Sequence, residues 1–115
     1  MRKFAPAFPV RDLAVSLAHY ARLGFTTAEY TGDSAAGRYG FARRDGVELQ
    51  LGTVPTGRTA SPATAYLYVD DADAIATKWR QTGAEVRWPE DTPWGQREGV
   101  MIDRDCNIIR FGSPL

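Results

Sequence analysis

The sequence predicts an α+β fold in which two βαβββ modules form curved mixed sheets around a ligand cleft. Two segments have helical periodicity, eight short runs are rich in β-prone residues, and the same order of elements occurs twice. With 115 residues the chain has the length of one compact domain. We therefore expect a single domain over residues 1–115, made of two repeats at about 1–54 and 62–115.

The two helices are predicted from apolar residues spaced three and four positions apart. The first stripe consists of Leu13, Leu17, Tyr20 and Leu23, and the second of Ala72, Ile75, Ala76 and Trp79. Asp12 and Asp71 directly precede the stripes and are candidate N-caps. Gly24 and Gly83 follow them, and glycine favours the left-handed conformation in which many helices end.

The strands are predicted from β-branched and aromatic runs that are bounded by turn residues. They cover residues 3–10, 25–30, 38–43, 47–53, 63–69, 85–88, 97–103 and 108–111. Turn-forming residues separate them at 31–33, 44–46, 55–62, 89–95 and 103–107. Strand, helix and three further strands therefore follow one another twice.

A shift of 59 positions superimposes the two halves of the chain. It carries Val10 onto Val69, Asp12 onto Asp71, Tyr20 onto Trp79 and Gly24 onto Gly83. Each matched pair has the same structural role, which indicates an internal repeat joined by the Pro-, Gly-, Ser- and Thr-rich segment 54–61. One module covers a single face of its sheet with a helix, so two modules facing each other would enclose a small-molecule pocket.

Composition excludes several classes of function. Fourteen basic and fourteen acidic residues cancel, and no Lys/Arg run follows a phosphate backbone, so nucleic acid is not an expected partner. Residues 1–10 have neither a signal core nor a membrane-spanning length, and the single cysteine, Cys106, cannot form an internal disulfide. A cytoplasmic protein without membrane contact is the expectation.

Three sets of motifs resemble the glyoxalase/bleomycin resistance protein/dioxygenase (vicinal oxygen chelate) superfamily. They are Val10-Arg11-Asp12-Leu13 with Leu23-Gly24-Phe25, Tyr68-Val69-Asp70-Asp71 with Gly83-Ala84, and Pro93-Trp94-Gly95-Gln96-Arg97-Glu98 with Asp103-Arg104-Asp105, Asn107 and Phe111. The third set is similar to the closing segment of bleomycin-resistance proteins, which bind rather than convert their ligand. The resemblance implies that family's fold, a homodimer, and sequestration of a planar aromatic antibiotic or metabolite.

The resemblance also implies where a metal would bind. Enzymes of the superfamily hold one divalent ion with His, Glu or Gln side chains from four strands, and the matching positions are Ala5, Gln50, Thr64 and Arg110. Alanine has no donor atom, and arginine is a permanent cation. The only histidine, His19, falls in the first predicted helix. We therefore expect no metal and no other cofactor, and we assign no catalytic residue.

The expected ligand site is an aromatic cleft with a few polar groups. Its candidate residues are Trp94, Tyr39, Phe41, Gln50, Glu48, Tyr66, Tyr68 and Arg110. If Gln50 and Arg110 face inward, as the resemblance implies, strand alternation places Glu48, Tyr66 and Tyr68 on the same face. By the same resemblance Trp94 and Tyr39 hold the ligand's rings between them, and Phe41 is the alternative to Tyr39. Acidic residues for a cationic ligand are Glu29, Asp33, Glu90 and Asp91.

Two alternatives stay open at this point. Arg110 either binds an anionic group of the ligand or pairs with Glu48 as a structural salt bridge. The chain is also compatible with a glyoxalase-fold enzyme. That enzyme would be either a metal-independent lyase or isomerase, with Arg110 at an oxyanion and Glu48 as base, or a metal-dependent lyase or dioxygenase with relocated ligands.

Overall fold

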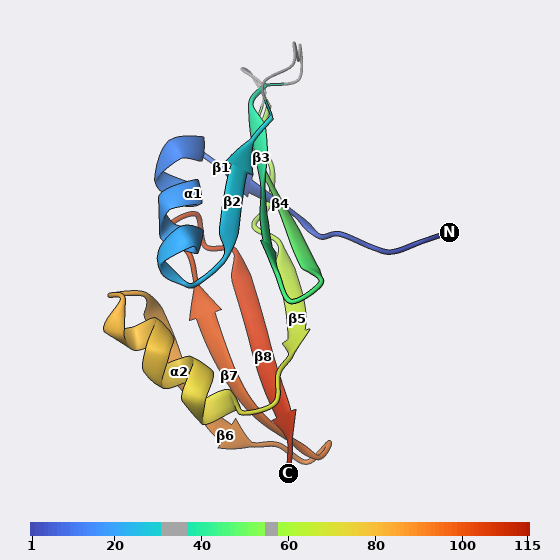
Figure 1. The fold of residues 1–115 in the computed structure, drawn as a ribbon, viewed down its shortest axis with the longest axis vertical. Helices are drawn as coiled ribbons and strands as arrows, with labels where there is room; N and C mark the ends of the chain where they lie inside the picture. The colour runs from blue at the N-terminus through green and yellow to red at the C-terminus, as the bar shows by residue number, and fades with distance from the viewer. Residues whose placement is uncertain (31–36, 55–57) are drawn as a thin grey trace. The chain divides into compact units, whose positions relative to one another are not determined.

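The computed structural model describes residues 1–30, 37–54 and 58–115; Asp33, the predicted turn at 31–33 and part of the predicted connection 54–61 lie outside these ranges. The elements in chain order are β1 (Ala7–Val10), α1 (Leu13–Arg22), β2 (Thr26–Glu29), β3 (Tyr39–Arg44), β4 (Val47–Thr53), β5 (Thr64–Tyr68), α2 (Ala72–Gln81), β6 (Glu85–Asp91), β7 (Gln96–Ile102) and β8 (Ile108–Pro114) (Figure 1). They form two units, residues 1–63 and 64–115. Each unit contains one helix and one four-stranded mixed sheet, so the predicted α+β class with two βαβββ modules is confirmed.

The first unit has the strand order β1-β4-β3-β2, with β1 parallel to β4 and the other neighbours antiparallel. Helix α1 lies against one face of this sheet (Figure 1). The apolar side chains of Phe8, Tyr20, Ala42 and Leu51 are fully buried between them. This core is what stabilises the unit, because each buried apolar side chain contributes roughly 1.5–3 kcal/mol.

The second unit repeats this arrangement with the order β5-β8-β7-β6. Strand β5 is parallel to β8, and β6, β7 and β8 are antiparallel neighbours. Trp79 of α2 packs edge-on against Phe111 of β8, with ring centroids 5.1 Å apart. Both rings are buried, together with Met101, so Trp79 has the core role expected from its helical spacing.

The offset of 59 residues is visible in matching structural details. Asp12 Oδ1 accepts a hydrogen bond from Val15 N at 3.1 Å, and Asp71 Oδ1 accepts one from Ala74 N at 3.1 Å. After each helix a glycine adopts a positive φ, +103° at Gly24 and +88° at Gly83. The capping and termination predicted for both helices are confirmed.

Three predicted strand boundaries differ from the structure by three or more residues, and proline explains two of these differences. Strand β1 begins at Ala7 instead of residue 3, after Pro6, which has no N–H to donate to a ladder. Strand β6 continues to Asp91 instead of ending at 88, with a register shift between Arg87 and Glu90 that accommodates Pro89. Strand β8 runs to Pro114, beyond the predicted end at 111, because it pairs with β7 over that whole length.

Both helices have ten residues. Within the described ranges, neither is long enough or apolar enough to cross a lipid bilayer.

Candidate functional site: two helix-free sheet faces

Each sheet has one face that packs on its helix and one that points away from it. A Cβ on Gly40 would meet Leu17 of α1, so Gly40 faces the helix and the alternating residues Tyr39 and Phe41 face away. In the second sheet Phe111 contacts Trp79 of α2, so Arg110 faces away. We call these two surfaces the first and the second helix-free face. Seven of the eight predicted site residues lie on them; the eighth, Trp94, is in a turn.

The first helix-free face carries a ladder of aromatic rings. Tyr30 stacks on Tyr39 with ring centroids 4.7 Å apart and 14° between the planes. Tyr39 in turn meets Phe41 edge-to-face at 5.8 Å, and the Arg43 guanidinium lies 4.6 Å from the Phe41 ring centroid. Flat rings stack favourably in such offset geometries, and the guanidinium adds a cation–π contact. The ladder is therefore a surface suited to a flat conjugated molecule.

Polar groups border this ladder. Gln50 is the register partner of Phe41, and Glu48 is the register partner of Arg43. Arg43 Nε donates to Glu48 Oε1 at 2.6 Å, and Lys3 Nζ lies 3.4 Å from the same oxygen. The hydrogen bond from Arg43 holds the pKa of Glu48 below its usual range; burial opposes this, and the charge of Lys3 adds to it. Glu48 is consequently a weak proton acceptor at neutral pH.

The second helix-free face combines two tyrosines with a partly buried ion pair. The rings of Tyr66 and Tyr68 are 4.9 Å apart and tilted by 47°. Arg110 Nε and Nη2 donate to Glu98 Oε2 and Oε1 at 3.0 and 2.9 Å, and the guanidinium carbon lies 5.1 Å from the Tyr66 ring centroid. The proposed pairing of Arg110 with Glu48 is wrong, because the guanidinium fork is taken up by Glu98 on the neighbouring strand.

Beside this ion pair, two buried oxygen atoms have no hydrogen-bond partner among the described residues: Tyr66 Oη and Gln96 Oε1. The Tyr66 ring reaches across Gly112, where a Cβ would collide with its hydroxyl. Burial raises the pKa of Tyr66, and the neighbouring Glu98 carboxylate raises it further. Tyr66 therefore keeps its proton under ordinary conditions.

Trp94 lies in the turn between β6 and β7, with 60 % of its surface exposed. Thr92 Oγ1 donates to Gln96 O at 2.8 Å, Thr92 N donates to Gln96 O at 2.9 Å, and Gly95 has a φ of +86°. The turn is thus held by its own hydrogen bonds and does not need the indole for packing. An exposed tryptophan in a hydrogen-bonded turn is available for contact with a ligand or partner.

Two of the four acidic residues predicted to attract a cationic ligand, Glu29 and Asp91, have basic partners. Arg38 Nη2 lies 2.6 Å from Glu29 Oε1, and Arg97 Nη1 lies 3.0 Å from Asp91 Oδ1. Glu90 is the register partner of Glu98. Local negative charge is therefore smaller than the count of carboxylates predicts.

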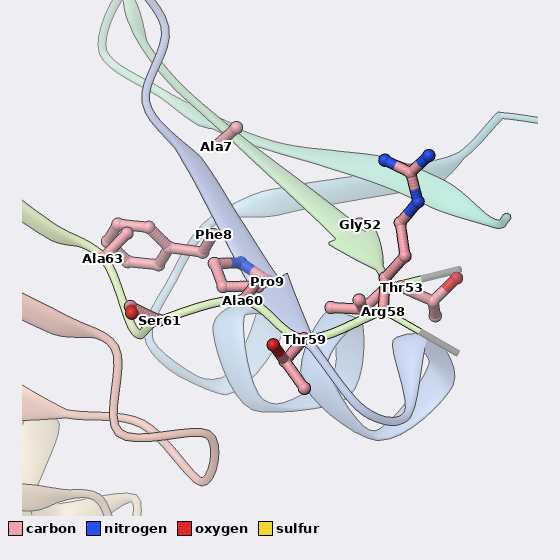
Figure 2. A pocket seen from close by; sticks show the side chains of 11 residues that line it. Ala7, Phe8, Pro9, Gly52, Thr53, Arg58, Thr59, Ala60, Ser61 and Ala63 are labelled. Carbon is pink, nitrogen blue, oxygen red and sulfur yellow. The ribbon is translucent and has the colours of Figure 1, made fainter. Parts of the chain in front are cut away.

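Two hollows border the helix-free faces. One, of about 470 Å³, is lined by Ala7, Phe8, Pro9, Gly52, Thr53, Val54, Arg58, Thr59, Ala60, Ser61 and Ala63. Figure 2 shows residues 58–63 passing beside β1, with Thr59, Ala60 and Ser61 near Pro9. The other, of about 480 Å³, lies along β6 and β7 and includes Trp88 and Glu98. Ala7 and Gly52 of the first helix-free face line the first hollow, and Glu98 and Val100 of the second face line the other. None of the eight predicted site residues lines either hollow.

Four residues that the sequence analysis did not select belong to the two faces: Tyr30, Arg43, Gln96 and Glu98. Strand alternation was a usable signal for Arg43, which follows Phe41 by two positions. The other three are brought to the site by cross-strand pairing, which no local pattern encodes.

A family model described as Glyoxalase/Bleomycin resistance protein/Dioxygenase superfamily matches residues 5–111 of the chain. No curated protein matches it.

Several solved structures are similar over essentially the whole chain. A bleomycin-binding protein complexed with bleomycin has 22% identity and a TM-score of 0.78, with 100% of both chains covered. A bleomycin resistance determinant encoded on the transposon Tn5 has 22% identity and a TM-score of 0.80, with 99% of this chain and 98% of that chain covered. TnmS3, an antibiotic-binding protein from Streptomyces sp. CB03234, has 27% identity and a TM-score of 0.70, with 100% and 99% covered.

Proposed function

Because the chain belongs to the glyoxalase/bleomycin resistance protein/dioxygenase superfamily, we propose that it binds and sequesters a planar aromatic antibiotic or metabolite without converting it. The observation that carries this proposal is the ladder of Tyr30, Tyr39 and Phe41 on the first helix-free face. Solved relatives described as binding bleomycin or another antibiotic support it.

The second helix-free face and the exposed turn supply further contacts in this proposal. Tyr66 and Tyr68 offer a second aromatic surface, and Trp94 offers a large flat side chain that its own turn does not bury. A ligand held between two aromatic surfaces loses most of its contact with water, which favours binding. We further propose a homodimer in which modules of two chains build each cleft.

A metal-free site is part of the proposal, and the donor set supports it. Of the four positions that match the family's metal ligands, Ala5 has only a methyl group and Thr64 a neutral hydroxyl. Gln50 offers one amide oxygen, and Arg110 is a cation engaged by Glu98. These groups do not fit a divalent ion, which prefers imidazole, thiolate or carboxylate ligands. Nor do three or more His, Cys, Asp or Glu side chains gather into a metal-binding group among the described residues.

The metal-independent enzyme is the weaker alternative. It would need Glu48 to take a proton, yet Arg43 and Lys3 lower the pKa of this carboxyl. It would also need Arg110 to face an oxyanion, yet both donating nitrogens of its fork are used by Glu98. Glu48 is therefore a weak base, and the Arg110 guanidinium is already engaged by another carboxylate, so neither group is suited to the catalytic role.

Titration with bleomycin and with flat heteroaromatic compounds, followed by tryptophan fluorescence, tests the proposal. Trp79 is buried, so the exposed Trp94 and Trp88 report on ligand. Trp94→Ala is expected to remove most of the quenching and to weaken binding roughly tenfold, the loss of a stacking contact worth about 1.4 kcal/mol. Trp88→Ala is the matched control, because Trp88 is also exposed and its ring lies against Arg80 instead.

Mass spectrometry of the ligand after long incubation separates binding from turnover. Recovery of the unchanged compound in stoichiometric amount is expected. A product that accumulates beyond the protein concentration would support the enzyme, and a set of flat compounds that all leave the fluorescence unchanged would refute sequestration. Light scattering with and without ligand tests the dimer.

A further inference from the structure

We propose that the second helix-free face contains a polar subsite, formed by Tyr66 Oη, Gln96 Oε1 and the Glu98 carboxylate, that accepts an N–H donor of the bound ligand. A primary amide is the chemical group that fits it best. This inference deepens the proposed function and rests on it, because the subsite would orient the ligand whose rings the aromatic surfaces hold.

The subsite exists because residue 112 has no side chain. Gly112 is the register partner of Tyr68 on one side and of Glu98 on the other, so it lies in the middle of the face. The missing Cβ lets the Tyr66 ring lie across β8 and brings its hydroxyl toward β7. Both Tyr66 Oη and Gln96 Oε1 lie within 3.4 Å of the place where a Cβ of residue 112 would be.

Neither oxygen makes a hydrogen bond of good geometry within the described residues, although the Glu98 carboxylate is close enough to the Tyr66 hydroxyl to raise its pKa. A buried polar atom without a hydrogen bond destabilises the fold, and native proteins keep few such atoms. A group that binds here and satisfies both atoms removes that destabilisation on binding, which makes the position a source of affinity.

The polar groups of this subsite favour a ligand group that donates hydrogen bonds over one that accepts them. Gln96 Oε1 and the Glu98 oxygens only accept hydrogen bonds, and the Tyr66 hydroxyl has one proton to donate and lone pairs to accept. The bidentate pair with Arg110 holds Glu98 in place and cancels its charge. A neutral group with two N–H bonds, such as a primary amide, matches this arrangement better than a carboxylate, which has no hydrogen to donate to the accepting oxygens.

Two acridines that share one ring system test the subsite. Acridine-9-carboxamide carries two N–H donors, and methyl acridine-9-carboxylate carries a carbonyl but no donor. The wild-type chain is expected to bind the amide roughly tenfold more tightly than the ester, the value of one to two hydrogen bonds. In Tyr66→Phe and in Gln96→Met the ratio of the amide affinity to the ester affinity is expected to fall to about twofold or less.

The ester affinity checks in each variant that the ring-binding surface is intact. Gln81→Met is the matched control for the glutamine substitution, because Gln81 is exposed at the end of α2, and it should keep the full preference. Equal affinities for amide and ester in the wild type would refute the subsite and leave sequestration standing. The subsite is also refuted, and sequestration left standing, if both variants keep the preference for the amide. A buried water would then satisfy the two oxygens. Failure of both acridines to bind would refute the proposed function for flat heteroaromatic rings, and the subsite with it.

Discussion

The side chain of Tyr66 occupies the space above Gly112 on the adjacent strand, so that a Cβ on residue 112 would overlap the phenol oxygen. Gly112→Ala is therefore expected to push the ring away and to lower the free energy of unfolding by roughly 1–3 kcal/mol, the usual cost of overpacking. Urea denaturation measures it. Gly52→Ala is the control, because the nearest side-chain atom to its new Cβ would be Tyr39 Cβ at an ordinary 3.6 Å. Equal effects of the two substitutions would contradict this account.

Cys106 has a φ of +65°, in the left-handed region that costs a side chain roughly 1–2 kcal/mol. It closes the turn in which Asp103 Oδ1 accepts hydrogen bonds from Asp105 N and Asn107 N, both at 2.9 Å. Cys106→Gly is expected to raise the free energy of unfolding by about 0.5–1 kcal/mol, after the larger unfolded-state entropy of glycine is subtracted. Cys106→Val, with its branched Cβ, should lower it. Thermal melts of the two variants measure these changes in stability. A Cys106→Val variant more stable than the wild type would show that the turn is not strained.

The aspartate caps of the two helices should have similar energetic value, since their geometry repeats. Asp12→Ala and Asp71→Ala are each expected to cost about 1 kcal/mol. Asn accepts the same hydrogen bond, so Asp12→Asn and Asp71→Asn should cost only a few tenths of a kcal/mol. Chemical denaturation of the four variants tests this, and an alanine variant as stable as the wild type would argue that its cap is not formed in solution.

The ion pairs of Glu48 predict that the stability of the fold depends on pH. Because the pKa of Glu48 is lowered in the folded chain, its pairing with Arg43 stabilises the fold above the ordinary carboxyl pKa and is lost as the pH falls through the lowered value. The difference in Tm between the wild type and Glu48→Gln should therefore shrink as the pH is lowered from about 6 to about 3. Melting curves over this range measure it. A difference that stays constant would mean that Glu48 keeps an ordinary pKa.

Much of the fold was predictable because it is encoded locally. Helical periodicity, an aspartate before each helix and a glycine after it occur within about a dozen residues of one another, and all of these predictions were confirmed. Strand alternation correctly placed Tyr39 with Phe41 on one face of β3, and Tyr66 with Tyr68 on one face of β5. The errors at residues 3–6 and 89–91 arose where proline interrupts or bends a strand, and the neighbouring strand then decides where pairing resumes.

The contacts between residues of the candidate site could not be predicted from the sequence. Glu98 was named only as part of the closing motif, and its pairing with Arg110 follows from the register of β7 against β8. The stacking of Tyr30 on Tyr39 and the position of Tyr66 over Gly112 likewise depend on which residues become cross-strand neighbours. A shift of one residue in either register would replace every one of these contacts.

The order of amino acids was thus sufficient to establish the repeated βαβββ pattern and the faces on which its side chains lie, because both follow from interactions within a few residues of the chain. Which charges pair, which rings stack and which buried oxygens are left without a partner emerged once the strands were aligned. Strand alignment is a property of the whole sheet, since it depends on burying one complete face at the same time.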